Sequence, residues 1–397
     1  MPERLALEGG TPVRPTFLPY SRPCLAPEDL DAAREVLASG WLTTGPTIAA
    51  FETAFAREVG AAEAVALASC TAALSLAYTA LPLGADDEVI VPAFTFAATA
   101  AAVVAAGGRP VVADVGEDLN LDPADAARRV TARTKALVAV HMGGLPCDFR
   151  ALEALAAPRG LAVIQDCAHA VGARYEDAPL GGRGFAACYS FHAVKQLAGG
   201  EGGALTTNDA RVAAHARLFR SHCQTTSAGT RHGRDADYRY DITGAGFNYR
   251  LPDVNAALVL SQLRRLPAAH ARRQALAARY DAAFAGRDDV DLIPTPAGVT
   301  HGRHLYIVKL RLERLRADRD AVFHALRAEN IGVNVHYIPL PYLSYYRERF
   351  SYRPGDFPVA ERLFERIISL PLFAGMTDAD AGDVIAAVDK VLTHYRR

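Results

Sequence analysis

Neither paired cysteines nor an excess of one charge marks this sequence. The cysteines number six and lie apart from one another: Cys24, Cys70, Cys147, Cys167, Cys188 and Cys223. Because they form no C-x-x-C pair, they predict reduced thiols in a cytoplasmic protein. The 43 lysines and arginines nearly cancel the 44 aspartates and glutamates, so the charge indicates neither nucleic acid nor an anionic membrane as a partner.

Long hydrophobic segments are missing as well. Residues 1–15 contain acids and no apolar core, which argues against a signal peptide or a membrane anchor at that end. The longest apolar run, residues 96–108, is alanine-rich, ends in glycines and is too short to span a bilayer. We therefore expect this run to form a buried helix.

From about residue 60 the sequence repeats one rhythm, in which a short apolar run is followed by a turn and a helical stretch. The apolar runs are residues 64–69, 87–94, 109–115, 135–141, 161–166 and 185–191. They are continuously hydrophobic rather than alternating, which is typical of strands covered on both faces. The pattern predicts an α/β fold with a mainly parallel sheet. Ligands bind at the carboxyl ends of the strands in such sheets.

A length of 397 residues predicts two lobes. Within the helical stretch 251–286, Asp253 is expected to cap the helix and Pro267 to kink or divide it. Strands are expected at residues 304–312 and 331–340, with helices between them and at the end. The predicted division is a large domain with an N-terminal arm (residues 1–260) and a smaller C-terminal α/β domain (residues 261–397).

Four features follow predicted strands, and each has an ordinary structural reading. Asp166 closes an apolar run, where it serves either a ligand or a helix cap or ion pair. Residues 69–74 (SCTAAL) offer free N–H groups to an anion, or are a simple helix start. Phe96 is a ring partner or a core residue. Ser190 and Lys195 precede a glycine-rich run that lets other atoms approach the backbone.

Together these features suit pyridoxal phosphate. The N–H groups of Cys70 and Thr71 would hold its phosphate with the Ser190 hydroxyl, and Phe96 would stack on its ring. Asp166 would pair with the ring nitrogen, and the Lys195 amine would bond to the aldehyde. Burial beside a cationic ring lowers the pKa of a lysine, which suits an amine that also moves protons.

Five motifs, in this order along the chain, carry a resemblance to a known family: residues 69–74, 91–100, 164–175, 189–209 and 246–258. The sequence resembles the sugar aminotransferases of the DegT/DnrJ/EryC1/StrS family. The resemblance implies an aspartate-aminotransferase-like (type I) fold and a homodimer with active sites at the subunit interface. It implies catalytic roles for Lys195, Asp166 and His169, and a phosphate contact for Ser190. Asn248 would be supplied to the phosphate by the neighbouring subunit.

The resemblance also indicates a substrate side. It places there Thr44, His192, Arg250, His336 and Tyr337. This chain departs from the family pattern at His169, where glutamine is frequent, and at Cys223, where glycine is common. Lys195 is retained, whereas relatives with histidine at that position are dehydratases.

The C-terminal stretch, residues 334–358, resembles the branch that aminates C4 of nucleotide-linked 4-keto-6-deoxyhexoses, with L-glutamate or L-glutamine as donor. Its tyrosines and arginines either bind the nucleotide sugar or form a surface or dimer seam. Amination at C3, a keto-cyclitol or aminohydroxybenzoate acceptor, and a non-catalytic sugar-binding or regulatory homologue stay open as alternatives. The nucleotide and the sugar stereochemistry stay open too.

Two other classes are disfavoured. No G-x-G-x-x-G follows a first strand, which argues against a nicotinamide oxidoreductase. A zinc site would have to use His141, Cys147, Cys167 or His169, whose spacing matches no common pattern, so no metal is expected.

Overall fold

The computed structural model describes residues 4–226 and 239–397. In this part of the chain the largest sheet has seven strands in the order β1-β9-β8-β5-β4-β2-β3. They are β1 (Glu63–Leu67), β2 (Glu88–Pro92), β3 (Arg109–Ala113), β4 (Thr134–Val140), β5 (Ala162–Asp166), β8 (Ala186–Ser190) and β9 (Gly203–Thr207). β9 runs antiparallel to both neighbours, and the remaining pairs are parallel. Each of the six predicted strand segments overlaps a strand of this sheet, and the α/β prediction is confirmed.

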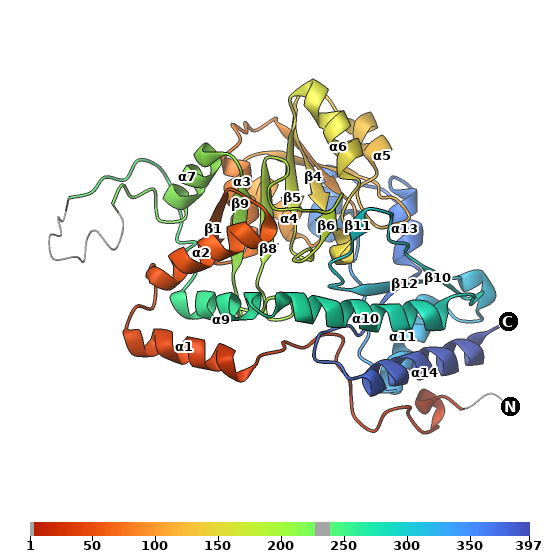
Figure 1. Ribbon diagram of the computed structural model, residues 1–397. Coiled ribbons are helices and arrows are strands. Elements are labelled where there is room, and N and C mark those ends of the chain that lie inside the picture. Colours follow the sequence, from red (N-terminus) through yellow and green to blue (C-terminus); the bar gives the residue numbers. More distant parts are fainter. Residues whose placement is uncertain (1–3, 227–238) are drawn as a thin grey trace.

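Helices cover both faces of this sheet, because successive strand side chains point to opposite sides. Val65 and Leu67 pack with α3, α4 and α7, whereas Ala64 and Ala66 pack with α2 and α9. Helices α5 and α6 cover the other end of that second face (Figure 1). These helices are α2 (Pro46–Val59), α3 (Cys70–Thr79), α4 (Ala98–Ala105), α5 (Pro123–Arg129), α6 (Phe149–Ala156), α7 (Ala210–Phe219) and α9 (Asp253–Leu263). The predicted buried helix within residues 96–108 is α4.

A second hydrophobic core lies in the C-terminal part, around the antiparallel sheet β10-β12-β13. Its elements are α10 (Leu266–Phe284), β10 (Val290–Leu292), β12 (Tyr306–Leu310), α11 (Arg319–Ala328), β13 (Ile367–Leu370) and α14 (Asp378–Tyr395). Figure 1 shows α10 between the large sheet and α14. Pro267 lies at the start of α10 and separates it from α9, as predicted. Leu5 and Leu18 from the N-terminal segment belong to this second core; the domain boundary at residue 260 stays a prediction.

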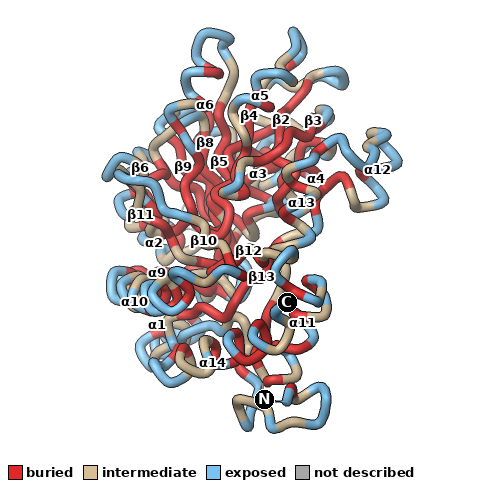
Figure 2. The backbone as a smooth tube through the Cα atoms, turned by 90° about the vertical axis from the view of Figure 1, so that its right-hand side faces the viewer, coloured by how far each residue is buried: buried red, intermediate tan, exposed pale blue. Residues whose placement is uncertain are grey.

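Small elements complete the fold. They are α1 (Pro27–Ser39), the three-stranded sheet of β6 (Arg174–Tyr175), β7 (Ala178–Pro179) and β11 (Val299–Thr300), and the helices α12 (Ser344–Phe350) and α13 (Pro358–Phe364). Figure 2 shows the buried backbone concentrated along the large sheet, with α12 at the periphery. None of the helices that the structure describes is long and apolar enough to cross a membrane.

Two local predictions are wrong. Asp253 does not cap α9, since Pro252 holds the cap position; its carboxylate instead accepts a hydrogen bond from the Gly45 N–H (2.8 Å), because the loop before α2 packs there. Residues 331–340 form no strand and pair only through isolated bridges at Ile331 and Asn334. The Asn334 side chain accepts the Val335 N–H (2.8 Å), and this local bond replaces a ladder bond.

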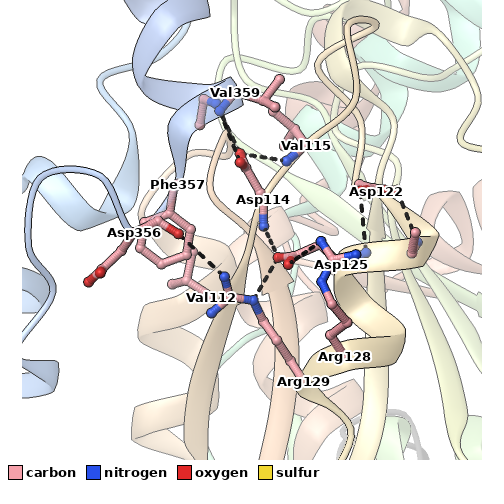
Figure 3. Close-up of polar contacts among 12 residues, drawn as sticks. Val112, Asp114, Val115, Asp122, Asp125, Arg128, Arg129, Asp356, Phe357 and Val359 are labelled. Carbon is pink, nitrogen blue, oxygen red and sulfur yellow. Dashed lines mark hydrogen bonds and ion pairs between the residues drawn. The ribbon is translucent and has the colours of Figure 1, made fainter.

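The segment containing α12 and α13 returns to the edge of the large sheet, where Asp114 holds it (Figure 3). The Asp114 carboxylate follows β3 and accepts the Val359 and Ala360 N–H groups at the start of α13 (3.0 and 2.9 Å). The Asp114 N–H in turn donates to Asp125 (2.6 Å). A negative charge at a helix start is favourable, so this contact fixes a segment 245 residues distant in sequence.

Candidate active site

One cavity of about 700 Å³ opens at the carboxyl ends of β5 and β8. The polar and aromatic residues that line it are Tyr20, Ser69, Cys70, Thr71, Thr95, Phe96, Asp166, His169, Ser190, His192, Lys195, Glu201, Asn334, His336 and Tyr337. They come from the N-terminal segment, from the strand ends of the large sheet and from the loop that follows α11. This is the edge of the sheet at which the sequence predicts a ligand.

Most of the predicted site residues meet in this cavity. They are Cys70, Thr71, Phe96, Asp166, His169, Ser190, His192, Lys195, His336 and Tyr337. Thr44, Asn248 and Arg250 do not line it within this chain. The structure thus brings together the residues expected around a cofactor, and the individual roles stay predictions.

The start of α3 forms one wall of the cavity. Ser69 is its N-cap, and the Ser69 hydroxyl accepts the Ala72 N–H (3.1 Å). The N–H groups of Cys70 and Thr71 lie in the first turn, where a helix provides no acceptor for them. Gly203 packs against this turn so closely that a Cβ there would lie 2.5 Å from the Cys70 nitrogen. Gly203 therefore lets β9 approach the start of α3 closely.

Lys195 differs from the other lysines of the chain. Lys135, Lys309 and Lys390 each have a carboxylate within 4.0 Å, whereas Lys195 has none among the residues described. Burial lowers the pKa of Lys195 to about 8, and the nearby charge of Asp166 opposes this shift. The amine is therefore partly unprotonated near neutral pH and is free to bond to an electrophile.

Asp166, at the end of β5, is buried and receives three donors. Thr99 donates to Oδ2 (2.7 Å), and the Ala168 N–H donates to Oδ1 (3.1 Å). The Cys70 thiol is a weaker donor to Oδ1 (3.9 Å). Burial raises the pKa of Asp166, while these bonds and the Lys195 charge lower it. The carboxylate faces the cavity and has capacity for a further donor.

His169 is a neutral imidazole held between two contacts. Burial lowers its pKa well below the usual value, and the charge of Lys195 adds to this effect. The Gly143 N–H donates to Nδ1 (3.3 Å), which leaves the proton on Nε2, 3.0 Å from the Tyr337 hydroxyl. The His304 ring lies 4.4 Å behind the His169 ring. His169 therefore presents a fixed ring to the cavity.

Phe96 and Ser190 also line the cavity. Phe96 is 61% exposed, so the alternative of a core residue is wrong. Its ring centroid lies 5.9 Å from that of Tyr337. Ser190 is buried at the end of β8, and its hydroxyl accepts the His192 N–H (3.3 Å). Both side chains border the same space as Lys195.

Sequence reasoning missed several cavity residues. Tyr20 comes from a segment with no strand-end signal. Asn334 belongs to the stretch 334–358 but was not singled out in it, and Glu201 lies within the glycine run. Arg347 and Arg349 belong to the stretch 334–358, whose arginines are expected either to bind the nucleotide sugar or to form a surface or dimer seam. They lie on α12, and no arginine lines the cavity in the described part of the chain. These arginines therefore do not line the cavity of their own chain, and their contact with the nucleotide sugar stays a prediction.

The cavity residues fit pyridoxal phosphate and give no sign of a metal. An anion-binding helix end, an amine, a carboxylate and aromatic rings converge there, and these are the groups that this cofactor needs. Among the described residues no cluster of three or more His, Cys, Asp or Glu could hold a metal ion. His141 is engaged by Gln165 (3.0 Å) and by the Cys147 N–H (3.0 Å).

Comparisons with known proteins agree with this geometry. The profile described as the DegT/DnrJ/EryC1/StrS aminotransferase family matches residues 23–389. The spore coat polysaccharide biosynthesis protein SpsC of Bacillus subtilis (strain 168) is 41% identical over 381 residues, which cover 95% of this chain and 97% of SpsC.

Two solved structures are similar over nearly their whole length. Helicobacter pylori PseC, an aminotransferase involved in the biosynthesis of pseudoaminic acid, has a TM-score of 0.90 and 30% identity, covering 96% of this chain and all of PseC (100%). DesI, solved in the presence of its TDP-sugar product, has a TM-score of 0.86 and 30% identity, covering 98% of this chain and 96% of DesI.

Proposed function

The chain belongs to the DegT/DnrJ/EryC1/StrS aminotransferase family, and from this membership we propose the substrates of its reaction. It is a pyridoxal-phosphate-dependent sugar aminotransferase with the fold of the known aminotransferases, as predicted. The proposed acceptor is a dTDP- or UDP-linked 4-keto-6-deoxyhexose, and the proposed donor is L-glutamate. The product would be the 4-amino-4,6-dideoxy sugar nucleotide.

The observation that carries this proposal is the cavity itself. Its volume of about 700 Å³ leaves room for a large substrate beside the cofactor. The cavity is also lined by Asn334, His336 and Tyr337, which are polar and aromatic groups suited to a sugar. That DesI was solved with a TDP-sugar product supports a nucleotide-linked acceptor.

Bound pyridoxal phosphate supplies an aldehyde that accepts an amino group and a ring that accepts an electron pair. The Cys70 and Thr71 N–H groups and the Ser190 hydroxyl would hold its phosphate. The Lys195 amine would bind the aldehyde. With its pKa lowered to about 8, this amine also accepts and returns a proton near neutral pH.

Asp166 and His169 would fix the orientation of the ring. The Asp166 carboxylate would bind the ring nitrogen and keep it protonated, since the carboxylate faces the cavity with acceptor capacity left. The neutral His169 ring would lie against the cofactor, held there by Gly143, Tyr337 and His304. Phe96 would contact the ring as well.

We also propose a homodimer with shared active sites. The cavity has no arginine among its described lining residues, although a cofactor phosphate and a sugar nucleotide are both anionic. Asn248 is exposed and lies outside the cavity of its own chain, as does the partly buried Arg250. Both would enter the cavity of the neighbouring subunit, and Thr44 would border the same seam.

The substrate is tested by a panel of keto-sugar nucleotides incubated with L-glutamate and analysed by mass spectrometry. We expect amination of 4-keto-6-deoxyhexoses and little product from 3-keto isomers. In a binding test, the 4-amino product should change the cofactor absorbance and the 3-amino isomer should not. Turnover only of a 3-keto sugar, or of a nucleotide-free keto-cyclitol or aminohydroxybenzoate precursor, would favour that alternative acceptor.

Shared sites are tested by mixing two inactive variants. Lys195→Ala and Asn248→Ala each damage every site of their own homodimer. A hybrid of the two has one site with both residues intact, so the mixture should regain about a quarter of wild-type activity after subunit exchange. No recovery with this pair, beside confirmed exchange, would refute the assignment of Asn248 to the neighbouring site.

A further inference from the structure

Two buried threonine hydroxyls form a chain that ends on the Asp166 carboxylate. Thr99 Oγ1 lies 2.7 Å from Asp166 Oδ2, and Thr95 Oγ1 lies 2.6 Å from Thr99 Oγ1. Thr95 is 1% exposed and Thr99 is fully buried. Thr99 lies in the first turn of α4 and Thr95 in the loop that precedes this helix, whereas Asp166 ends β5. The proposed function so far assigns no task to either hydroxyl.

The chemistry of the three groups fixes the direction of donation. An ionised carboxylate only accepts hydrogen bonds, so the single proton of Thr99 must point to Asp166. The contact between the two hydroxyls then requires Thr95 to donate to Thr99. Hydrogen bonds in such a chain polarise one another, so the donation to the carboxylate becomes stronger.

Burial works against the charge on Asp166. Removal from water raises the pKa of this carboxyl, and the Thr99 hydrogen bond is the strongest of the contacts that lower it again. The Ala168 N–H and the distant Cys70 thiol are the other donors. Without Thr99, Oδ2 would keep no donor from the described part of the protein, and the carboxylate would be free to rotate and to bind a proton.

The backbone that carries Thr99 is itself held in place. The Tyr78 hydroxyl of α3 donates to the Thr99 carbonyl oxygen (3.1 Å), and both residues are fully buried. The Thr99 hydroxyl is therefore a fixed donor. It leaves part of the acceptor capacity of the carboxylate for a ligand, since a carboxylate has about four acceptor positions.

We propose that Thr99, supported by Thr95, is a positioning residue that keeps the Asp166 carboxylate ionised and aimed at the ring nitrogen of the cofactor. The inference rests on the proposed pairing of Asp166 with that nitrogen. It adds two residues that have no assigned contact with cofactor or substrate in the proposed function; Thr99 acts through Asp166, and Thr95 acts through Thr99.

The test compares binding of two ligands to the apo-protein. One is pyridoxal 5′-phosphate, and the other is its analogue with a C–H group in place of the ring nitrogen. The ratio of their dissociation constants, measured by fluorescence titration, reports the contact at the ring nitrogen without any turnover. We expect wild type to prefer the natural cofactor. Thr99→Val should reduce this preference about fivefold, whereas Thr99→Ser, which keeps the hydroxyl, should retain it.

Control variants separate this effect from a general loss of stability. Thr206→Val removes another fully buried hydroxyl, which lies on β9, two strands from β5, and donates to the Gly181 carbonyl oxygen (2.9 Å); this change should leave the ratio unchanged. Thr95→Val should reduce the ratio about twofold, a smaller effect because Thr95 acts through Thr99. If Thr99→Val does not stay folded at the temperature of measurement, Thr95→Val tests the proposal in its place. An unchanged ratio in Thr95→Val would then overturn the proposal that the two hydroxyls act on Asp166.

Asp166→Asn distinguishes the two levels of the hypothesis. Equal ratios in wild type and Asp166→Asn would refute the proposed role of Asp166, and the inference with it. A ratio that falls in Asp166→Asn but stays within twofold of wild type in Thr99→Val would refute the role of Thr99 alone. A fall in both variants, with Thr99→Ser and Thr206→Val unchanged, is the result expected.

Discussion

Asp114 and Asp166 stand at the carboxyl ends of two strands in the same sheet, β3 and β5, and each residue is only 6% exposed. Asp114 accepts N–H groups of Val115, Val359 and Ala360, so backbone atoms of its own chain surround the carboxylate (Figure 3). Asp166 accepts two side-chain donors and one N–H group, and it also borders the large cavity.

The difference shows that burial alone does not identify a functional carboxylate. Both aspartates have donors, so neither is an unsatisfied charge. Asp114 ties a distant helix to the sheet, which is the cap that sequence reasoning weighed as the ordinary alternative for Asp166. Asp166 instead interacts with the charge of Lys195, whose pKa is lowered, and it lines the large cavity. The kind of donor that a buried carboxylate has, and its access to a cavity, distinguish a ligand-binding aspartate from a structural one.

Lys195→Ala should have the largest effect on the Asp166 side of this comparison. Turnover should fall about 10⁴-fold or more, since the covalent attachment and the proton carrier are lost together. The melting temperature should change little. Steady-state rates with glutamate, beside borohydride trapping and peptide mapping, measure this effect. Lys135→Ala, which removes a lysine paired with Asp87 on the surface, is the control.

The mapping has few candidates, because the chain contains four lysines: Lys135, Lys195, Lys309 and Lys390. Recovery of the reduced cofactor on any lysine other than Lys195 would move the active site away from Asp166 and remove the basis of the comparison.

Asp166→Asn should lower turnover by about 10²–10³-fold, because the ring nitrogen loses its negative partner. The free energy of unfolding should change much less, since a buried charge is removed at the same time. Kinetics and urea unfolding on the same preparation measure the two effects. A near-normal rate would show that Asp166, like Asp114, is a structural residue.

The titration of Lys195 sharpens the same contrast. With a pKa of about 8, its unprotonated fraction in the apo-protein should rise about tenfold between pH 7 and pH 9. Competitive acylation followed by mass spectrometry measures this fraction. The Asp166 charge favours the protonated amine, so Asp166→Asn should move the midpoint to lower pH. Asp114→Asn should leave it unchanged, and an equal shift in both variants would contradict the assignment.

Much of the fold followed from the sequence because the signals were local. Continuous apolar runs marked six of the seven strands of the large sheet among the described residues, and Pro267 marked the start of α10. The strand predicted at residues 331–340 was wrong. Their apolar pattern matches a strand, but the Asn334 side chain accepts the Val335 N–H group. The helix cap predicted for Asp253 was wrong because its hydrogen-bond partner, Gly45, lies 208 residues away in sequence.

The active-site residues that lie at or just after a predicted strand could be identified from the sequence. Asp166, Ser190 and Lys195 are of this kind, and the structure places them around one cavity. Thr95 and Thr99 were not recognised, because only the tertiary structure reveals that Thr99 contacts Asp166 and that Thr95 contacts Thr99. Tyr20 escaped notice for a similar reason, since the N-terminal segment reaches the cavity only through tertiary structure.

Asp114→Asn should have the smallest effect on catalysis and a clear effect on stability. Its amide loses the charge that favours the start of α13 and turns a donor toward the Val359 or Ala360 N–H. The free energy of unfolding should fall by about 1–3 kcal/mol, while turnover per folded molecule stays near wild type. Asp122→Asn is the matched control, since asparagine caps a helix about as well as aspartate and Asp122 already caps α5 locally. Urea unfolding of wild type, Asp114→Asn and Asp122→Asn measures the free energy of unfolding. Turnover measured at urea concentrations well below the unfolding transition separates an effect on catalysis from this effect on stability. If Asp114→Asn instead lowered turnover as strongly as Asp166→Asn, then position relative to the cavity would not distinguish the two aspartates, and the α13 contact would have to control the active site through residues 334–343.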